Sequence, residues 1–397
     1  MKQHYLATLF DPASIAVIGA SDTEGAVGKT VFGNLLEGGY TGQLFAINLR
    51  HASVMGRSAV RHISQIDTPI DLAVITTPSR TLIEVVTECG KHGVKAVAVM
   101  SCDFVGTEQR AGQLLERLHA LCKQYHMRLL GPTVFGFQRP VSKLNSGNYV
   151  GQVKPGNMAL ISQSSSVTSA ILDWAETQDI GFSSVISLGS AVDVDVGESL
   201  DYLVSDPKTH SILLYIEDIQ DARIFMSALR AAARSKPVMV LKVGRYDDPV
   251  ALARTHSERL IGRDNVFDVA LRRAGVLRLR SINQLFIAAR VLTGNVRTRG
   301  RRLAVITNGI GAGMMAVDRA RDLHIQLPRL TDSTIARLDS LLPPQSSHDN
   351  PIDILAMPTP LALPIPRRRC WRTPISMACW WCLPRRWAPI IWPRRRP

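Results

Sequence analysis

No run of apolar residues in this sequence reaches the roughly 18 positions that a membrane-spanning helix needs. The first twelve residues, MKQHYLATLFDP, also lack the apolar core of a secretory signal. Cysteines number only six in 397 residues, and the first three are scattered through apolar contexts, as reduced cytosolic thiols are. A single CxxC pair near the C-terminus has no second pair to complete a zinc site. We therefore expect a cytoplasmic protein with neither a membrane helix nor a metal site.

Acidic residues are missing from the end of the chain, and this distorts the overall charge. The net charge is +14, but residues 357–397 contain nine arginines, no lysine and no acid, which leaves +5 for the first 356 residues. The body of the protein is thus only mildly basic. Its charge is no reason to expect a nucleic-acid partner.

The same tail, residues 357–397, also lacks any helical or strand periodicity. It holds nine prolines and five of the six tryptophans. Arginine with interleaved tryptophan can bind nucleic acid or an anionic membrane. However, Arg, Pro, Ala, Trp and Cys also become frequent together when GC-rich coding DNA is translated in the wrong frame. We expect the tail to be a disordered product of a frameshift and the full-length protein to be longer.

The body shows a repeated alternation of apolar strands and amphipathic helices. In residues 1–140 helices are expected at about 27–37, 80–92 and 107–125, between strands such as SIAVIGA and LAVITTP. A second unit of the same kind spans 150–295, and a third begins at 300 and continues to 355. Continuous apolar strands that alternate with helices predict an α/β fold with parallel sheets covered on both faces.

The stretch SIAVIGASDTEGAVGKTVFGNLL, residues 14–36, predicts a strand, a glycine turn and a helix that could bind phosphate. A nucleotide P-loop requires a glycine where Thr23 stands, and the dinucleotide fingerprint requires one where Ser21 stands. The second strand ends AINLR, without the acid that binds a ribose. Arg50 ends that segment and can bind a phosphate instead, so an NADP-binding oxidoreductase remains an alternative.

The residues around this turn suit an anionic ligand. Gly19 permits a tight turn and close approach of the backbone. Ser21 and the amides of the following helix can bind an anion, and Arg50 offers a charge-assisted bond to a second phosphate. Thr76 and Thr77 end the third strand, at the carboxyl edge where parallel sheets bind ligands.

Several motifs in sequence order resemble the NDP-forming acyl-CoA synthetases, including the succinyl-CoA synthetase α subunit. They are VIGAS, AINLR, VITTPS, LLGPTVFGF, ALISQSSSV, THSERLIGRD and NPIDIL, and the resemblance spans residues 8–355. It implies a Rossmann-like CoA-binding domain, then a succinyl-CoA synthetase-like flavodoxin-like domain, and then the start of a second flavodoxin-like domain. It also assigns the binding of CoA or acetyl-CoA to Gly19, Ala20, Ser21, Asn48, Arg50, Thr76, Thr77 and Pro78.

The resemblance also implies a phosphoryl-transfer site in the second unit. In the family, the histidine that matches His256 is phosphorylated, and a carboxylate that matches Glu217 holds its ring. Ser164, Ser165 and Ser166 match the phosphate cradle at a strand-to-helix turn. ATP or ADP is bound in the family by an ATP-grasp domain. No such domain is present in this sequence, so we expect nucleotide only through a partner.

Three departures from the family pattern bear on activity. Ser165 and Asp218 replace glycines, and Glu258 follows the histidine, so a side chain would crowd the phosphoryl group and two carboxylates would repel it. The segment DVDVGESLDYLVSD further resembles bacterial protein lysine acetyltransferases, whose GNAT domain is not found here. We therefore expect the regulatory, acyl-CoA-binding region of such an acetyltransferase, which acts on protein substrates. The alternative is an α-like subunit of an ADP-forming acetyl- or acyl-CoA synthetase that uses His256 with an ATP-grasp subunit.

Overall fold

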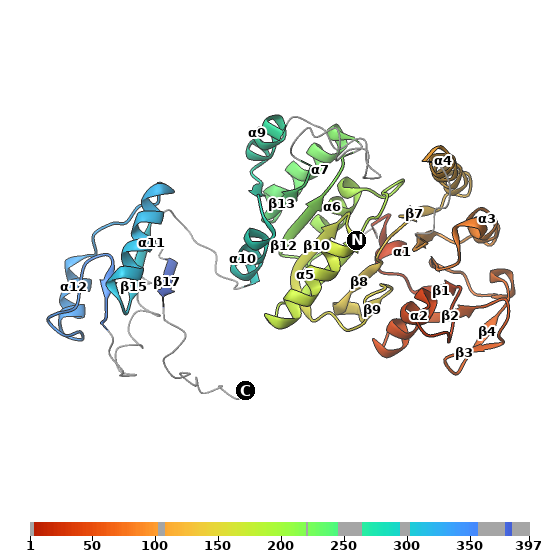
Figure 1. Ribbon diagram of the computed structural model, residues 1–397, viewed down its shortest axis with the longest axis horizontal. Coiled ribbons are helices and arrows are strands. Elements are labelled where there is room, and N and C mark those ends of the chain that lie inside the picture. Colours follow the sequence, from red (N-terminus) through yellow and green to blue (C-terminus); the bar gives the residue numbers. More distant parts are fainter. Residues whose placement is uncertain are drawn as a thin grey trace. The chain divides into compact units, whose positions relative to one another are not determined.

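The computed structural model describes residues 4–101, 108–219, 221–244, 264–293, 302–355 and 378–382. The chain divides into two compact units, residues 1–295 and 296–397 (Figure 1). Within the described residues, the first unit contains two seven-stranded sheets and the second a three-stranded sheet. The predicted α/β class with largely parallel sheets is confirmed.

The first sheet has the strand order β3-β4-β2-β1-β5-β6-β7, and only the short hairpin β3–β4 is antiparallel. Its strands are β1 (Ser14–Ile18), β2 (Gln43–Ile47), β3 (Ser53–Val54), β4 (Arg57–Val60), β5 (Leu72–Ile75), β6 (Ala96–Val99) and β7 (Arg128–Leu130). The helices are α1 (Ala7–Phe10), α2 (Val27–Glu37), α3 (Leu82–Lys91) and α4 (Glu108–Gln124), with the 3-10 turns η1 (Ile63–Gln65) and η2 (Ser79–Thr81).

Both faces of this sheet are covered, which explains why its central strands are continuous apolar runs. Ile15 and Val17 of β1 pack into one apolar cluster with side chains of α2. Ala16 and Ile18, which alternate with them, pack into another cluster with side chains of α3 and α4. Every residue of β1 and β5 is consequently buried.

The second sheet has the order β14-β13-β12-β10-β11-β8-β9. Its strands are β8 (Phe137–Arg139), β9 (Leu144–Asn145), β10 (Pro155–Ser162), β11 (Phe182–Ser187), β12 (Ser211–Ile216), β13 (Val238–Lys242) and β14 (Leu277–Leu279). Its helices are α5 (Ser165–Thr177), α6 (Val196–Ser205), α7 (Ala222–Ser235), α9 (Asp264–Ala274) and α10 (Ile282–Thr293), with the 3-10 turn η3 (Pro140–Ser142). The strands are parallel except for β8, which is antiparallel to both β11 and β9.

The two sheets of the first unit share an apolar cluster and a partly buried ion pair. Phe10 of α1 lies 4.9 Å, between ring centroids, from Phe137 of β8, and both belong to a cluster that includes residues from each sheet. Arg128 of β7 donates from Nε and Nη2 to the two carboxylate oxygens of Asp193, at 2.9 and 3.1 Å. It also donates to Glu198 of α6. The amide of Leu129 adds a bond of 2.7 Å to Asp193, so this carboxylate joins the last strand of the first sheet to the second sheet's domain.

The turn that follows β7 adopts an unusual backbone conformation at Thr133. Its φ is +62°, in the left-handed region that β-branched residues rarely occupy. Its hydroxyl donates to the Pro132 carbonyl at 2.7 Å and lies 3.3 Å from the Ser190 hydroxyl. The Ser190 amide donates to the same Pro132 carbonyl at 2.9 Å. The strained residue therefore stands where the first sheet's domain meets the loop after β11.

The second unit contains β15 (Leu303–Thr307), β16 (Ile352–Asp353) and β17 (Ala378–Cys382), with helices α11 (Ile310–Asp322) and α12 (Asp332–Asp339). β15 is parallel to both of its neighbours. The expected strand, glycine turn and helix at 302–322 are therefore present. The tail was expected to be disordered, but its only described residues, 378–382, form β17. The rest of the tail lies outside the described residues. The origin of the tail in a frameshift and the exact domain limits remain predictions.

Sequence periodicity located most of the elements and missed several short strands. The helix expected at 27–37 has those limits, whereas β3, β4, β8 and β9, of two to four residues each, were not expected. In the described ranges, no helix has both the length and the hydropathy that crossing a membrane requires.

Replacing Thr133 with asparagine should stabilise the protein. The left-handed conformation costs a β-branched residue roughly 1–2 kcal/mol and costs asparagine less. We expect Thr133→Asn to raise the free energy of unfolding of the first unit by about 1 kcal/mol in urea titrations. Thr133→Val keeps the strained backbone and loses the hydroxyl, so it should lower that free energy by about 1 kcal/mol. An asparagine variant no more stable than the wild type would contradict the strain.

Candidate functional site

The turn after β1 brings three backbone segments into close contact. Gly19 has φ +95°, and a Cβ atom there would lie 2.7 Å from Oγ1 of Thr76 and 3.0 Å from Cγ2 of Thr77. A Cβ atom on Gly28, in the first turn of α2, would lie 1.9 Å from the carbonyl oxygen of Gly19. Only glycine at both positions lets α2 begin directly against the turn. The first amides of α2 have no side-chain cap, as in helices that bind anions.

Asn48 connects this turn to the segment after β2. Its Nδ2 donates to the carbonyl of Ala20 at 2.7 Å, and its Oδ1 accepts the amides of Arg50 and His51 at 2.8 and 2.9 Å. Both ends of the side-chain amide are thus engaged within the protein. The structure therefore gives Asn48 the function of holding two loops together at the carboxyl edge of the sheet.

The threonines that end β5 are also partly engaged. Thr76 donates from its hydroxyl to the Ile18 carbonyl at 3.0 Å, beside the β1 turn. Thr77 accepts from the Thr81 hydroxyl at 2.9 Å, and the carbonyl of Pro78 accepts from the same hydroxyl at 2.8 Å. These contacts hold the end of η2 against the residues that follow β5. The predicted Gly19, Ala20, Asn48, Thr76 and Thr77 are therefore brought together.

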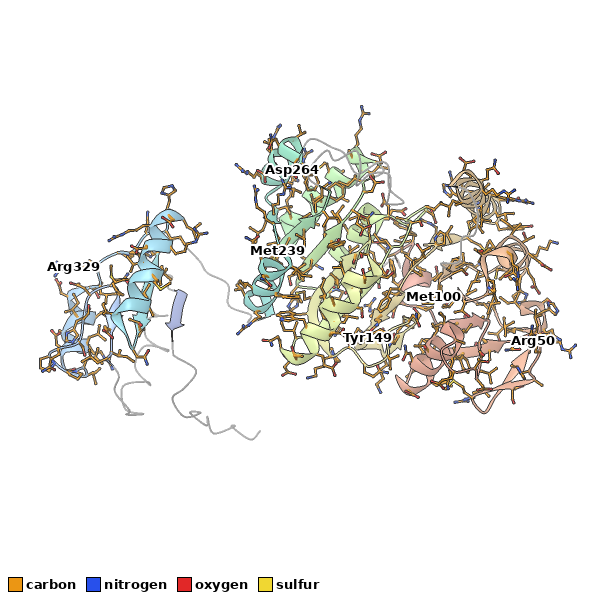
Figure 2. The ribbon with its side chains drawn as sticks, in the orientation of Figure 1. Arg50, Met100, Tyr149, Met239, Asp264 and Arg329 are labelled. Carbon is orange, nitrogen blue, oxygen red and sulfur yellow. The ribbon has the colours of Figure 1, made fainter. Side chains whose placement is uncertain are left out.

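Ser21 and Arg50 lie at the outer side of the same edge. The hydroxyl of Ser21 accepts the Thr23 amide at 3.0 Å, which shapes the loop before α2. Arg50 is exposed, at the margin of the first sheet's domain in Figure 2, and no ion-pair partner is recorded for it among the described residues. A guanidinium in this position is available to an anionic ligand.

The second sheet has its own polar edge, where β10 turns into α5. Ser164 precedes the helix without capping it through its side chain, so the first helical amides, those of Ser165 and Ser166, are not satisfied by that hydroxyl. The hydroxyls of Ser164 and Ser166 lie 3.2 Å apart. The backbone of this turn is fixed by Ser162, whose hydroxyl accepts the Ser164 amide at 3.1 Å.

Glu217 follows the neighbouring strand β12 and lies against this serine turn. The Ser164 hydroxyl is near enough to this carboxylate to act on its pKa. Partial burial raises the pKa of the Glu217 carboxyl, and the Ser164 hydroxyl opposes that rise. The structure therefore brings the predicted carboxylate and the predicted serine cradle together. His256 lies outside the described residues, and so does Glu258.

Gln163 links the serine turn to the backbone at Glu217, and the sequence analysis did not predict this role. Its Oε1 accepts the amides of Glu217 and Asp218 at 2.7 and 3.0 Å, and its Nε2 donates to the Asp218 carbonyl at 2.9 Å. Asp218 in turn uses its own carboxylate to accept the Ile219 amide at 2.8 Å. A glutamine between a strand and a serine turn gives no local signal of this role, because its partners are 54 and 55 residues away.

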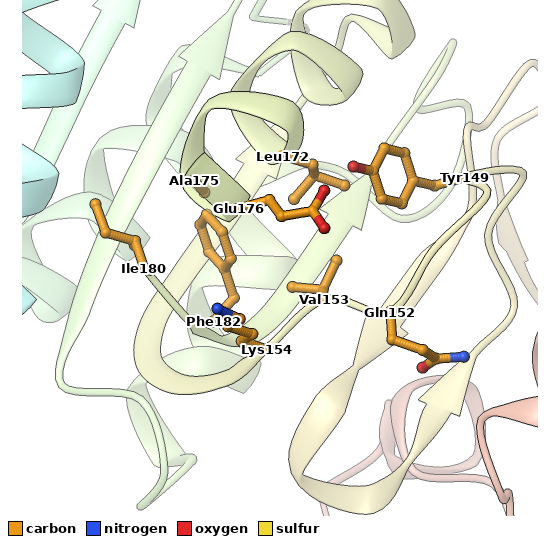
Figure 3. A pocket seen from close by; sticks show the side chains of 9 residues that line it. All are labelled: Tyr149, Gln152, Val153, Lys154, Leu172, Ala175, Glu176, Ile180 and Phe182. Carbon is orange, nitrogen blue, oxygen red and sulfur yellow. The ribbon is translucent and has the colours of Figure 1, made fainter. Parts of the chain in front are cut away.

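A separate small pocket lies at the opposite ends of the same strands (Figure 3). Leu172, Ala175 and Glu176 of α5 line it together with Phe182, the first residue of β11. None of the predicted site residues lines this pocket. Elsewhere in the described ranges, no three His, Cys, Asp or Glu side chains are grouped as metal ligands would be.

Comparisons with known proteins agree with this two-domain arrangement. Residues 13–140 match a model described as a CoA binding domain, and residues 155–292 match a succinyl-CoA ligase like flavodoxin domain. A dinucleotide forming acetyl-coenzyme A synthetase 1 from Ca. Korarchaeum cryptofilum, solved with phosphate and ADP, superposes with a TM-score of 0.83. It shares 33% identity over 88% of this chain and 76% of its own.

Curated relatives carry more specific names. The ADP-forming acetate–CoA ligase I subunit alpha of Pyrococcus furiosus is 35% identical over 89% of this chain and 77% of its own length. An ADP-forming acetate–CoA ligase of Methanocaldococcus jannaschii is 32% identical, and there this chain spans half of the relative's length.

Fold and sequence together define a CoA-binding domain joined to a succinyl-CoA ligase-like domain, the arrangement of the nucleoside-diphosphate-forming acyl-CoA synthetases. Within that class, this chain belongs to the family of the α subunits of ADP-forming acetate–CoA ligases.

The expectation of a regulatory region of a protein lysine acetyltransferase is therefore wrong, and the synthetase alternative is the better one. The NADP-dependent oxidoreductase is not supported either, since the first domain matches a CoA-binding model. The expected repulsion of a phosphoryl group by Asp218 stays a prediction; in the structure this carboxylate accepts the Ile219 amide.

Gly19 and Gly25 offer a matched test of the turn. Both have positive φ, but a Cβ atom on Gly25 would meet nothing within 4 Å. We expect Gly25→Ala to lower the free energy of unfolding by about 1 kcal/mol, and Gly19→Ala by about 2–4 kcal/mol because the added methyl group overpacks the contact with β5. Chemical denaturation of the two variants provides the measurement. Equal losses would show that the turn has room to relax.

Proposed function

We propose that this chain acts as the α-like subunit of an ADP-forming acyl-CoA synthetase. The observation that supports this best is that Gln163 bonds the backbone at Glu217 to the serine turn at the start of α5, where the Ser164 hydroxyl opposes the rise that burial causes in the pKa of the Glu217 carboxyl. A half-buried carboxylate, two serine hydroxyls and uncapped helix amides meet there. Hydroxyl and amide donors suit a transferring phosphoryl group, and the carboxylate suits the orientation of an imidazole.

The proposed reaction proceeds in three transfers. A phosphate oxygen bonds to the acyl carbon of acyl-CoA as the carbon–sulfur bond breaks, which releases the CoA thiol. A nitrogen of His256 then bonds to phosphorus, and the carboxylate product leaves. Finally the phosphoryl group passes from the histidine to ADP and forms ATP. In this scheme Ser164, Ser166 and the first amides of α5 hold the phosphoryl oxygens, and Glu217 holds the ring of His256.

The carboxyl edge of the first sheet is the proposed site for CoA. The uncapped start of α2 and the Ser21 loop face the pyrophosphate, and Arg50 binds a further phosphate. Gly19 and Thr76 act by keeping the turn compact, as the close contacts between them indicate. Asn48 acts on the ligand indirectly, since its amide is used by Ala20 and by the backbone at Arg50.

An ATP-grasp subunit is the proposed partner, because two relatives of which this chain covers 77% and 75% are named as α subunits. Acetate is the acyl group to test first, since both of those subunits belong to acetate–CoA ligases.

Removal of the Arg50 charge should weaken CoA binding. A charge-assisted bond to phosphate is worth about 1.5–3 kcal/mol, so Arg50→Ala should raise the dissociation constant of CoA roughly 10- to 100-fold in calorimetry. Arg117→Ala, which removes an equal exposed charge from α4, should leave binding unchanged. Equal affinity of the wild type and Arg50→Ala would exclude Arg50 from the site, and binding of NADP without CoA would overturn the assignment of the domain.

Phosphorylation of His256 tests the transfer itself. The protein is incubated with γ-labelled ATP, magnesium and the ATP-grasp subunit of a related synthetase. We expect acid-labile, base-stable label on the wild type and on His210→Ala, whose histidine is an exposed surface residue, but not on His256→Ala. Glu217→Gln should label more slowly, by at least about tenfold, because a neutral amide stabilises the charged ring less. Label that persists in His256→Ala would reject the proposed phosphohistidine.

A further inference from the structure

Gln163 occupies the point where the two halves of the proposed transfer site meet. It stands between Ser162, the last residue of β10, and Ser164, which precedes α5. Its side chain crosses to the adjacent parallel strand and contacts the backbone directly after β12. The serine turn belongs to one strand and Glu217 to the other. Gln163 is therefore the described side chain that ties the first of these segments to the backbone of the second.

The three bonds use the full chemistry of an amide. Oε1 accepts two backbone amides, those of Glu217 and Asp218, and Nε2 donates to the Asp218 carbonyl. These bonds fix the amide of Glu217 and both the amide and the carbonyl of Asp218. The peptide group between the two residues therefore cannot flip. A carboxylate in place of this amide would lose the donor, and an apolar side chain would lose all three bonds.

We propose that Gln163 is a positioning residue that sets the Glu217 carboxylate against the start of α5. This inference rests on the proposed function, because Glu217 is taken there to orient the phosphorylated histidine. Glu217 touches the reacting groups in that scheme, and Gln163 acts only through it. The absence of charge on the Gln163 side chain is part of this proposal, because an amide can form hydrogen bonds beside a phosphoryl group without repelling it.

Two substitutions separate the accepting and donating ends of the amide. Gln163→Met removes both ends at similar length. Gln163→Glu keeps the acceptor but sets a carboxylate oxygen against the Asp218 carbonyl at neutral pH. On protonation, the carboxyl regains an O–H donor and matches the amide, and this is half complete at the ordinary glutamic acid pKa of about 4.3. Gln178→Glu, an exposed glutamine at the C-terminal end of α5, controls for the added charge.

The transfer rate is measured from pH 5 to pH 8 with the ATP-grasp subunit present and is divided at each pH by the wild-type rate. We expect Gln163→Met to be slower by about 10- to 100-fold at every pH, since small misplacements of this kind are that costly. Gln163→Glu should be as slow at pH 7.5 and begin to recover at pH 5, where about a sixth of a carboxyl with the ordinary pKa is protonated. Gln178→Glu should stay at the wild-type rate throughout.

Hydrogen exchange of the Glu217 and Asp218 amides provides a second readout that needs no activity. Exchange should be fast in Gln163→Met and slow in both the wild type and Gln163→Glu, whose carboxylate still accepts. A folded Gln163→Met with the wild-type rate, or a Gln163→Glu that does not recover at low pH, would overturn the proposal. If the wild type itself transfers nothing, the proposed function fails. Hydrogen exchange then still tests whether Gln163 holds the loop after β12. Unchanged protection of the Glu217 and Asp218 amides in Gln163→Met would reject that role.

Discussion

The bond between Arg128 and Asp193 is the interaction on which the first unit depends most. Arg128 lies on β7, the edge strand of the first sheet, and Asp193 lies just before α6 of the second sheet's domain. Two hydrogen bonds join their side chains, and the Leu129 amide donates a third to Asp193. Both side chains are largely withdrawn from solvent, so loss of Arg128 would leave the Asp193 carboxylate without its charged partner, and loss of Asp193 would leave Arg128 with Glu198 alone. Phe10 and Phe137 pack at the same junction. The CoA-binding and ligase-like domains are thereby joined by a specific contact and not by a linker alone.

Side-chain amides perform the same task in both domains. Asn48 joins the loops after β2 and β1, and Gln163 joins the loops after β10 and β12. In each case one side chain donates to a carbonyl and accepts two backbone amides, which a carboxylate or an ammonium group cannot do. Both residues are uncharged and stand where phosphate groups are proposed to bind. The carboxyl edges of parallel strands leave backbone groups unpaired, and a neutral amide satisfies them without altering the local charge.

Much of this arrangement was accessible from the sequence because its signals are local. The continuous apolar strands and the helix at 27–37 follow from periodicity, and Gly19 follows from the turn it must form. The hydrogen bonds between Gln163 and the loop after β12 could not be predicted from the sequence, because they form only when β10 and β12 pair side by side. The function was misjudged because single departures from the family pattern, such as Asp218, were given more weight than the motifs shared along residues 8–355.

The strand β17 shows that a segment of unusual composition can pair with a sheet. Its five residues, ACWWC, come from a tail of unusual composition, and they pair in parallel with the whole of β15. Such pairing is made by main-chain amides and carbonyls, which every residue except proline supplies in full. The hydrogen bonds to β15 therefore require an extended backbone, which segments of very different composition can supply as long as proline is absent from the paired positions.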